Sequence, residues 1–360
     1  MSESAFKYLS GVQMTARNHL VPTCVMLELT PRCSLDCKMC YVHLTNEQMK
    51  GKKELSGEQW KKIIDDFVEL GAFDFLLTGG ECMMHPDFKD IYLYLLTKPV
   101  FVTINSNATL FNDEYFKFFA EHKPHKIKIS LYGSSEDGYE RVTGHRVYSR
   151  VLNNILKLKE LGIYISLSVT VSRQMMHEAG DIIAFALEHD IEYNTDTSMV
   201  QANSDTGRHM DDYAMTADEL IETLTTIRNR FGWKSFQNDV VAVEKDLLEG
   251  EPEVRSMYCS AGRSKAAVAW DGTIKPCIWF ENEDCLKCNE VGVKKAWEHC
   301  NEVSHNFVLP IECTKCEYFS VCHPCPLARM DPNNPGHRNL AMCQATVARI
   351  NAGFAKFEKK

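Results

Sequence analysis

Three cysteines lie close together near the start of the chain. Cys33, Cys37 and Cys40 follow the apolar stretch Val25–Leu29, which is typical of a buried strand. Thiolates are the usual protein ligands of cubane iron–sulfur clusters, which take one ligand for each of their four irons. A loop with three thiolates therefore leaves one iron open to a ligand that is not part of the protein. A structural zinc site is the alternative, but zinc needs a fourth nearby ligand, and His43 is the only close candidate.

The composition of the chain favours a metal-binding protein of the cytoplasm. There are 15 cysteines in 360 residues, and the segment Met1–Leu20 lacks the pattern of a secretion signal. A reducing cytoplasm does not preserve structural disulfides, so dense cysteine there indicates metal ligands. No apolar run approaches the roughly 18 residues that a membrane span needs. The net charge of -9 argues against a broad nucleic-acid interface. We therefore expect neither a membrane nor a nucleic acid as partner.

Short apolar runs alternate with amphipathic segments from residue 25 to about residue 200. The expected strands are Val25–Leu29, Phe73–Leu77, Val100–Asn105, Lys126–Leu131, Tyr164–Val171 and Ile191–Asp196. The expected helices are Gly57–Leu70, Phe88–Leu96, Asp113–Glu121, Ser149–Leu161 and Met176–His189. This alternation predicts an α/β fold with a parallel sheet covered by helices. Six units are too few to close an eight-stranded barrel, so we predict a partial (β/α)6 TIM-like barrel with its chemistry at the carboxyl ends of the strands.

The sequence divides into four parts. They are an amino-terminal segment (1–23), the barrel core (24–215), a bridging helical segment (216–257) and a small cysteine-rich domain (258–360). In the bridging segment, Thr216 and Glu219 predict a capping box at the start of a helix over Ala217–Arg230. In the last part we expect short elements, and Asp271-Gly272 predicts the turn of a β-hairpin over Val268–Lys275.

The spacing Cys33-x3-Cys37-x2-Cys40 resembles the signature of radical S-adenosylmethionine (SAM) enzymes. In that family the open iron is chelated by the amino and carboxylate groups of the methionine part of SAM. Reduction by one electron then cleaves SAM to a 5′-deoxyadenosyl radical. The resemblance implies that the protein positions SAM and shields the radical from water, because the cofactor carries the difficult chemistry. It also implies an electron donor of the flavodoxin or ferredoxin type.

Other motifs of that family follow the later strands. Thr78-Gly79-Gly80-Glu81 resembles the GGE motif that meets the methionine ammonium, where glycine permits close approach of the backbone. The run Asn105-Ser106-Asn107-Ala108 stands where relatives have a Thr-Asn-Gly turn, from which it departs. Ser130 and Arg141 resemble the residues that meet the ribose and the methionine carboxylate. The residues that the resemblance assigns to SAM are thus Gly79, Gly80, Glu81, Asn105, Ser130 and Arg141.

A second group of cysteines resembles the SPASM extension, which holds two auxiliary four-iron clusters in relatives. It comprises Cys259, Cys277, Cys313, Cys316, Cys322, Cys325 and Cys343, and we call it the carboxy-terminal cysteine array. The gap from Cys316 to Cys322 is too short for paired zinc knuckles. One departure is that two residues, where relatives usually have three, separate Cys322 and Cys325. By resemblance, the distal cluster would be held by Cys313, Cys316, Cys322 and Cys343, and the nearer one by Cys259, Cys277 and Cys325.

Two complete auxiliary clusters need eight thiolates, and the array supplies seven. Cys285 or Cys288 could complete the nearer cluster. If neither does, its open iron could bind a substrate group such as a peptide thiolate. Cys24, Cys82 and Cys300 are expected to pack as small hydrophobic residues. An alternative role for Cys82, Cys285 or Cys288 is to donate a hydrogen atom to a substrate radical.

The two auxiliary clusters imply an enzyme that acts on peptides. In relatives of this kind, hydrogen abstraction from a peptide or protein residue leads to a crosslink or thioether, an epimerised residue or an oxidised one. Enzymes that mature sulfatases place an aspartate directly after the cysteine aligned with Cys277, where this chain has Ile278. The main alternative is a dehydrogenase of a small-molecule alcohol such as a sugar or aminocyclitol. A cluster-storing scaffold is disfavoured, because the first loop has only three cysteines and a GGE motif follows.

The sequence shows no obvious domain that would recognise a peptide substrate. Crosslinking enzymes often carry a precursor-binding domain before the barrel, but here only a short segment precedes it. We therefore expect recognition by a separate protein, by the barrel surface or by the polar loop Gln201–Thr216. Within that loop, the run Arg208–Asp212 is expected to be solvated, and the nearby aromatic residues Trp270, Trp279 and Tyr213 are expected to pack in the core.

Overall fold

The sheet of this protein is open and almost entirely parallel. The computed structural model describes residues 3–200, 204–209, 212–232, 259–281, 283–323, 325–331, 333–334 and 336–357. Within them, eight strands form one sheet in the order β6-β5-β4-β3-β2-β1-β7-β8. The strands are β1 (Cys24–Thr30), β2 (Asp74–Gly79), β3 (Phe101–Ser106), β4 (Lys126–Ser130), β5 (Ile165–Thr170), β6 (Glu192–Asp196), β7 (Lys265–Val268) and β8 (Ile274–Lys275). β8 pairs antiparallel with β7, and every other neighbouring pair is parallel.

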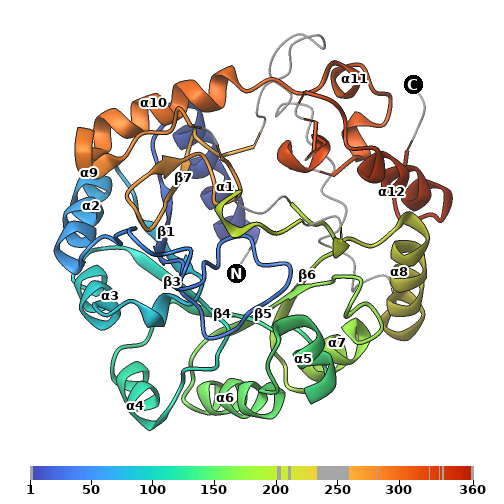
Figure 1. Cartoon of the computed structure of the whole chain (residues 1–360), viewed down its shortest axis with the longest axis horizontal. Coiled ribbons are helices and arrows are strands. Elements are labelled where there is room, and N and C mark those ends of the chain that lie inside the picture. Colours follow the sequence, from blue (N-terminus) through green and yellow to red (C-terminus); the bar gives the residue numbers. More distant parts are fainter. Residues whose placement is uncertain are drawn as a thin grey trace.

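Helices surround the outer face of this sheet in a ring (Figure 1). They are α2 (Gly57–Glu69), α3 (Phe88–Leu96), α4 (Asp113–Glu121), α5 (Glu136–Thr143), α6 (Tyr148–Glu160), α7 (Ala179–Glu188) and α8 (Ala217–Phe231). The α/β class and the partial barrel are confirmed, and the six predicted strands all form. The predicted helix over Met176–His189 starts three residues late, at Ala179. The helix α5 was not predicted, because Gly138 within it lowers the helix propensity of a short polar segment.

Alternating residues of β1 show that the two faces of the sheet differ in polarity. Val25, Leu27 and Leu29 are completely buried in the main hydrophobic core. The buried aromatic residues Trp60 and Phe67 of α2 belong to the same core, which therefore lies between sheet and helices. Side chains alternate along a strand, so Glu28 and Thr30 point to the inside of the barrel. The inner face thus carries polar groups at the carboxyl end of β1.

The local signals for turns and helix starts are confirmed. Thr216 accepts a hydrogen bond from the backbone of Glu219, whose side chain accepts one in return, and α8 begins at Ala217. The hairpin between β7 and β8 turns at Gly272, whose φ of 93° requires glycine. The bridging residues from 233 onward, up to 258, lie outside the described residues. The domain boundaries of the sequence stay a prediction, although the barrel sheet continues into β7 and β8.

The carboxy-terminal region contains more regular structure than the sequence predicted. Its elements are α9 (Cys288–Val291), α10 (Val293–Asn306), α11 (Ile311–Thr314), η6 (Phe319–Val321), η7 (Leu327–Arg329) and α12 (Leu340–Asn351). The expectation of short elements alone was wrong for α10 and α12. In Figure 1, α10 continues the outer ring beside α2, and α12 packs against α8. Both helices therefore help to close the ring where the barrel has no further unit.

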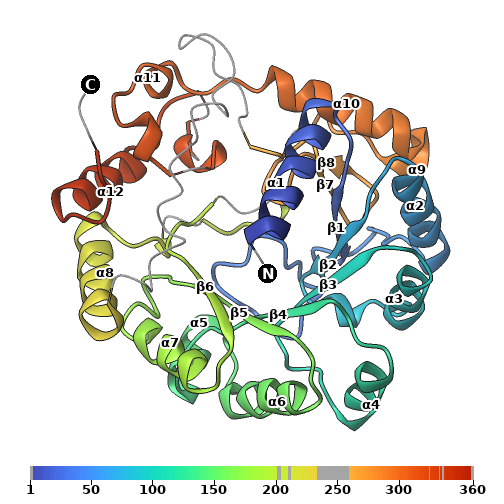
Figure 2. The same cartoon turned by 180° about the vertical axis from the view of Figure 1, so that it is seen from behind.

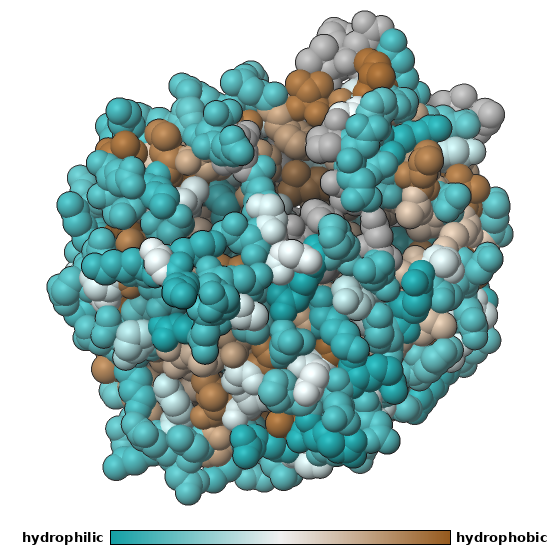
Figure 3. Space-filling view, in the orientation of Figure 1, coloured by the Kyte–Doolittle hydropathy of each residue, from teal (hydrophilic) through white to brown (hydrophobic). Residues whose placement is uncertain are grey.

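An amino-terminal helix, α1 (Glu3–Asn18), precedes the first strand. Seen from behind, α1 crosses the middle of the ring (Figure 2). The side chain of Trp297 on α10 donates a hydrogen bond of 2.9 Å to the carbonyl of Leu20, directly after α1. The opposite face is mainly hydrophilic, with a hollow in its upper half where hydrophobic residues are visible (Figure 3). No helix in the described part of the chain is long and apolar enough to cross a membrane.

Candidate active site

The three amino-terminal cysteines lie in a loop at the carboxyl end of β1, as the barrel prediction requires. We call residues 33–40 the cluster loop. Its backbone is tied to α5, because the amides of Asp36 and Lys38 donate to the carbonyls of Thr143 and Val142 at 3.0 and 3.1 Å. Burial raises the pKa of all three thiols, that of Cys33 to about 12. The thiols therefore keep their protons at neutral pH unless a metal replaces them.

The two glycines of the GGE motif pack directly against the chain that leads into the cluster loop. The amide of Gly80 donates to the carbonyl of Thr30, and the amide of Glu81 to that of Arg32, both at 2.8 Å. A Cβ atom on Gly79 would lie 2.3 Å from the carbonyl oxygen of Thr30, and one on Gly80 would lie 2.4 Å from that of Arg32. Both positions therefore need glycine for this approach of two backbones.

The carboxylate of Glu81 is buried and holds the turn that follows β3. It accepts hydrogen bonds from the Ser106 hydroxyl at 3.0 Å and from the Asn107 amide at 2.8 Å. Burial raises the pKa of Glu81 to about 7, although these bonds oppose the shift. In this structure the carboxylate thus joins the GGE motif to the turn after β3. Its predicted contact with the methionine ammonium stays a prediction, as do those of both glycines.

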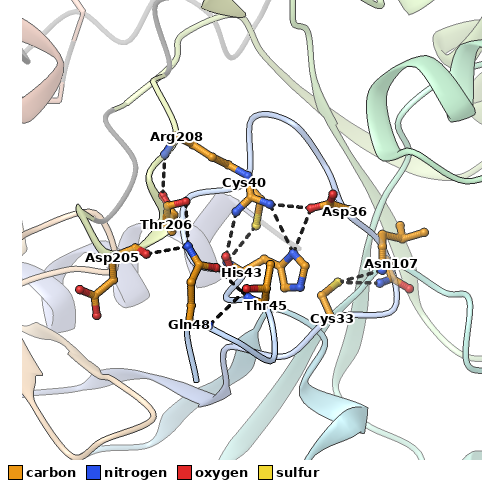
Figure 4. A network of polar contacts seen from close by, with 11 residues as sticks. Cys33, Asp36, Cys40, His43, Thr45, Gln48, Asn107, Asp205, Thr206 and Arg208 are labelled. Carbon is orange, nitrogen blue, oxygen red and sulfur yellow. Dashed lines mark hydrogen bonds and ion pairs between the residues drawn. The ribbon is translucent and has the colours of Figure 1, made fainter. Parts of the chain in front are cut away.

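Asn107 is the residue of this turn that reaches the cluster loop (Figure 4). Its side-chain NH2 donates to the sulfur of Cys33 at 3.4 Å and to the hydroxyl of Ser34 at 3.1 Å. Its side-chain oxygen accepts from the amide of Thr109 at 2.9 Å, which fixes the orientation of the amide group. The sequence assigned Asn105 to SAM and gave Asn107 no role. The available signal was Ala108, which stands where a Thr-Asn-Gly turn has its glycine and so aligns Asn107 with the asparagine; in the structure Ala108 has a φ of 59°.

Asn105 remains a candidate for contact with SAM. It lies near the carboxyl end of β3, and among the described residues no group donates to its buried side-chain oxygen. Its carbonyl accepts a hydrogen bond from the thiol of Cys82 at 3.4 Å. Cys82 is fully buried, as expected for a packed cysteine. A role of Cys82 as hydrogen donor stays a prediction.

Ser130 and Arg141 occupy different surroundings. Ser130 ends β4 at the same edge of the sheet as the cluster loop and hydrogen-bonds the side chain of Tyr132. Arg141 on α5 forms an ion pair with Glu178 and donates to the carbonyl of Gln174 at 2.9 Å. Ser130 thus lies at the edge of the sheet that carries the cluster loop, whereas Arg141 is bonded to residues just before α7. Binding of SAM by either residue stays a prediction.

A second contact with the cluster loop comes from the loop after β6, as Figure 4 shows. The guanidinium of Arg208 donates to the carboxylate of Asp36 at 2.6 Å and to the carbonyl of His43 at 2.8 Å. The expectation of a solvated Arg208 was wrong, because its side chain is only 15% exposed. Its positive charge favours the thiolate forms of Cys37 and Cys40. The sequence did not predict this contact, because Asp36 and Arg208 lie far apart along the chain and no local pattern links them.

His43, the candidate fourth zinc ligand, belongs to the same network. Its Nδ1 lies 3.4 Å from the carboxylate oxygen of Asp36, and its pKa is lowered by burial and by the nearby Arg208. In the described part of the chain, no three His, Cys, Asp or Glu side chains converge on the place of one metal ion.

The distal cysteines of the carboxy-terminal array surround one cavity. Its lining includes all four members of the set that the resemblance assigns to the distal cluster: Cys313, Cys316, Cys322 and Cys343. The buried Arg329 lies in the same wall, and its guanidinium donates to the carbonyl of Phe319 at 2.9 Å. The hydroxyl of Thr346 donates to the sulfur of Cys322 at 3.5 Å. Four thiols around one cavity form a donor set that fits a four-iron cluster.

The nearer cysteines lie beside the barrel. Cys259 and Cys277 pack against the buried residues Ala261, Phe280 and Val303. Cys325 is close to both, since its charge raises the pKa of Cys277 and the charge of Cys259 raises the pKa of Cys325. The pKa of Cys277 is raised to about 12, mainly by burial. Three of the four ligands for the nearer cluster therefore gather as the resemblance implies.

A ring contact joins the residue after the cluster loop to the segment that carries Cys277. The ring of Tyr41, next to Cys40, contacts that of Trp279 edge to face at a centroid distance of 6.4 Å. The expectation that Trp279 packs in the core was wrong, because it is 38% exposed. Beneath this contact, Lys275 of β8 forms an ion pair of 3.3 Å with the buried Glu28 of β1. Both regions thus face the inside of the barrel.

Comparison with known proteins identifies the family. Residues 27–186 match the model of the radical SAM superfamily. The chain is a radical SAM enzyme. It is 24% identical over 342 residues to the antilisterial bacteriocin subtilosin biosynthesis protein AlbA of Bacillus subtilis strain 168, covering 89% of this chain and 70% of AlbA. Its match to the PqqA peptide cyclase of Bradyrhizobium diazoefficiens is 27% identical and spans about half of each protein, 51% and 48%.

Solved structures share the fold of this radical SAM enzyme. The structure of native anSMEcpe with bound AdoMet and Cp18Cys peptide has a TM-score of 0.68 at 16% identity, covering 92% of this chain and 96% of anSMEcpe. Streptococcus suis SuiB bound to S-adenosylmethionine also has a TM-score of 0.68 at 16% identity, with coverage of 96% and 84%. Through its sequence relatives, the enzyme is related to peptide-modifying SPASM enzymes.

SAM and a four-iron cluster are the cofactors that this family implies, and the residues of the cluster loop fit them. Cys37 is buried and Cys33 and Cys40 are partly buried, all three within residues 33–40, and the fourth nearby donor, His43, lies 3.4 Å from the carboxylate of Asp36. Asn107 of the turn after β3 and Arg208 hold the cluster loop, and the GGE backbone holds the chain just before it. This donor set leaves one iron position without a protein ligand, which is what binding of SAM requires.

Proposed function

We propose that this radical SAM enzyme abstracts a hydrogen atom from a residue of a peptide or protein and so modifies it after translation. The modification would be a crosslink or thioether, an epimerised residue or an oxidised one. The observation that carries the proposal is that the four distal cysteines of the carboxy-terminal array line one cavity, and that Tyr41, directly after the cluster loop, contacts Trp279, two residues after Cys277. This arrangement supports a substrate position between the cluster loop and an auxiliary cluster.

The proposed cofactors are SAM and three [4Fe–4S] clusters. When bound and reduced, SAM and the first cluster supply a carbon-centred radical that removes the hydrogen atom from the substrate. Cys33, Cys37 and Cys40 would hold the first cluster, and the carboxy-terminal array would hold two more. A flavodoxin or ferredoxin of the cytoplasm would donate the electron.

The chain's own residues would prepare the site for this chemistry. Asn107 orients the Cys33 sulfur, and Arg208 places positive charge beside Cys37 and Cys40. Gly79 and Gly80 keep the GGE backbone in contact with the chain before the cluster loop. Asn105 and Ser130 lie at the carboxyl ends of β3 and β4, where they can meet the nucleoside part of SAM.

The names of the relatives support a peptide substrate. They include the mycofactocin maturase MftC of Mycolicibacterium smegmatis, 24% identical over 86% of this chain, and the sporulation killing factor maturation protein SkfB of Bacillus subtilis. SuiB has been solved bound to precursor peptide SuiA. The AdoMet-dependent heme synthase of Nitratidesulfovibrio vulgaris, 24% identical over 84% of this chain, keeps a small-molecule substrate as the alternative. An alcohol such as a sugar or aminocyclitol belongs to that alternative.

The test begins with protein reconstituted without oxygen. We expect about twelve irons per chain, from three four-iron clusters. After reduction with SAM, 5′-deoxyadenosine should form, and a Cys33→Ala variant should form none. Deuterium-labelled candidate peptides should pass deuterium into 5′-deoxyadenosine. Labelled small alcohols or tetrapyrroles that pass deuterium where peptides do not would replace the peptide proposal, and cluster-bound protein that never cleaves SAM would end it.

A further inference from the structure

We propose that Cys285 is the fourth protein ligand of the nearer auxiliary cluster, together with Cys259, Cys277 and Cys325. This inference rests on the proposed function, because it assumes that the carboxy-terminal array binds two clusters. It assigns the eighth thiolate that the spacing of the array leaves open.

The first argument is the position of Cys285. Its side chain packs against the same three buried residues, Ala261, Phe280 and Val303, as those of Cys259 and Cys277. After Cys277 the chain turns back on itself, and the amide of Phe280 donates to the carbonyl of Cys277 at 3.2 Å. Cys285 therefore returns to the hydrophobic cluster against which Cys277 packs.

The second argument is that Cys285 is held in place from both sides. The carbonyl of Asp284 lies 2.8 Å from the Nε2 of His299 on α10. The carbonyl of Leu286 accepts from the amide of Ile274 on β8 at 2.9 Å. Because both neighbours are bonded to regular elements, the position of Cys285 does not depend on a metal. A thiol that is held beside two others needs little rearrangement to become a ligand.

A buried cation lies beside this segment. Lys275 of β8 stands two residues before Cys277 and is 6% exposed, and its ammonium lies 3.3 Å from the carboxylate of Glu28 and 3.3 Å from the carbonyl of Ile278. A four-iron cluster with four thiolates is an anion, so a buried cation near one of its ligands offsets part of the cost of burying it.

The competing cysteines fit less well. Cys288 begins α9 and is buried in the main core, apart from the small cluster against which Cys259 and Cys277 pack. Its amide donates to the carbonyl of Gly272 at 2.8 Å, on the hairpin side of the segment. Cys300 of α10 is 1% exposed and also belongs to the main core. Cys285 is only partly buried and packs against the small cluster.

Full ligation has a consequence for the reaction. With four protein thiolates, the nearer cluster has no iron free for a substrate thiolate. Cys285 would then be bound to iron and could not donate a hydrogen atom. Among the three hydrogen-donor candidates, the inference therefore leaves Cys82 and Cys288.

The experiment counts the irons that lack a complete set of protein ligands. The parent protein carries Cys33→Ala, Cys37→Ala and Cys40→Ala, so that only the auxiliary clusters, about eight irons, remain. Ferricyanide removes an iron that has only three protein ligands and leaves a three-iron cluster with a characteristic electron paramagnetic resonance signal. We expect almost no such signal from the parent. Adding Cys285→Ala should produce about one three-iron cluster per chain or the loss of about four irons. Adding Cys288→Ala or Cys300→Ala should produce neither.

The inference is overturned if the parent already gives about one three-iron cluster, or if Cys288→Ala or Cys300→Ala gives the change in place of Cys285→Ala. A parent with no iron would overturn it together with the proposed auxiliary clusters, which separates the two failures. A second measurement needs no variant. In the iron-loaded native enzyme, iodoacetamide should leave Cys285 unmodified, and chelation of iron should expose it. Equal modification before and after chelation would contradict ligation.

Discussion

The two cysteine regions of this enzyme are built in different ways. The cluster loop donates hydrogen bonds to α5 and accepts them from Asn107 and Arg208, and the chain just before it accepts hydrogen bonds from the GGE motif. All of these partners belong to the barrel. Of the distal cysteines, Cys343 lies on α12, but Cys313, Cys316 and Cys322 lie in short elements and turns with local backbone bonds, such as those from the amide of Cys316 to Cys313 and from Cys322 to Tyr318, at 3.2 and 2.9 Å. A loop that is held by a barrel can keep its shape without metal. A region of short turns gains much of its order from the metal that it binds.

Removal of iron should therefore separate the two regions, with the largest effect that we expect. After anaerobic chelation, amide hydrogen exchange in residues 311–331 should speed up by at least about 100-fold, because the cluster supplies folding free energy there. Exchange in β1 to β5 should change little. Equal loss of protection in both regions would contradict the difference in construction.

The buried Glu81 makes the amino-terminal region sensitive to pH. Its pKa is raised to about 7 in the folded protein, from 4.5, so the folded state binds this proton more tightly than the unfolded state. Stability should thus be greatest below about pH 4.5 for this group and fall as the pH rises towards 7, by up to about 3 kcal/mol. Urea unfolding between pH 5 and 8 should show this slope in the native enzyme and not in Glu81→Gln. Parallel slopes would show that another group is responsible.

Gly80→Ala tests the close packing of the GGE motif against the chain before the cluster loop. The added Cβ would lie 2.4 Å from the carbonyl oxygen of Arg32, so one backbone must move, at a cost of about 2 kcal/mol. Iron per chain should fall by about four, because only the first cluster is affected. Gly11→Ala is the matched control, since its added Cβ meets nothing within 4 Å. An unchanged iron content in Gly80→Ala would show that the loop tolerates the shift.

Asn107→Ala should give the smallest effect and the most local one. Removing the hydrogen bond to the Cys33 sulfur destabilises the reduced, more negative cluster, so its reduction potential should fall by about 20 to 60 mV. Potentiometry without SAM measures this shift. Asn105→Ala is the control, because its side chain bonds no cysteine in the described part of the chain and its loss should leave the potential unchanged. A shift in Asn105→Ala alone would reverse the assignment of the two residues.

Local patterns in the sequence determined most of the barrel. Alternating apolar residues predicted the six parallel strands, helical periodicity predicted their helices, and capping and turn residues predicted the start of α8 and the β7–β8 hairpin. The spacing of Cys33, Cys37 and Cys40 predicted the radical SAM family. These features are encoded within a few residues, so they can be read without knowledge of the fold.

Tertiary structure decided which distant segments meet at the site. The approach of Arg208 to Asp36, the choice of Asn107 over Asn105 beside Cys33, and the different surroundings of Cys285 and Cys288 each depend on contacts between separate elements. The pairing of β7 with β1, which attaches the segment of the nearer cysteines to the barrel sheet, joins strands about 240 residues apart. Sequence spacing limits which residues can act, but the packing of the folded chain selects among them, because side-chain contacts depend on distance in space.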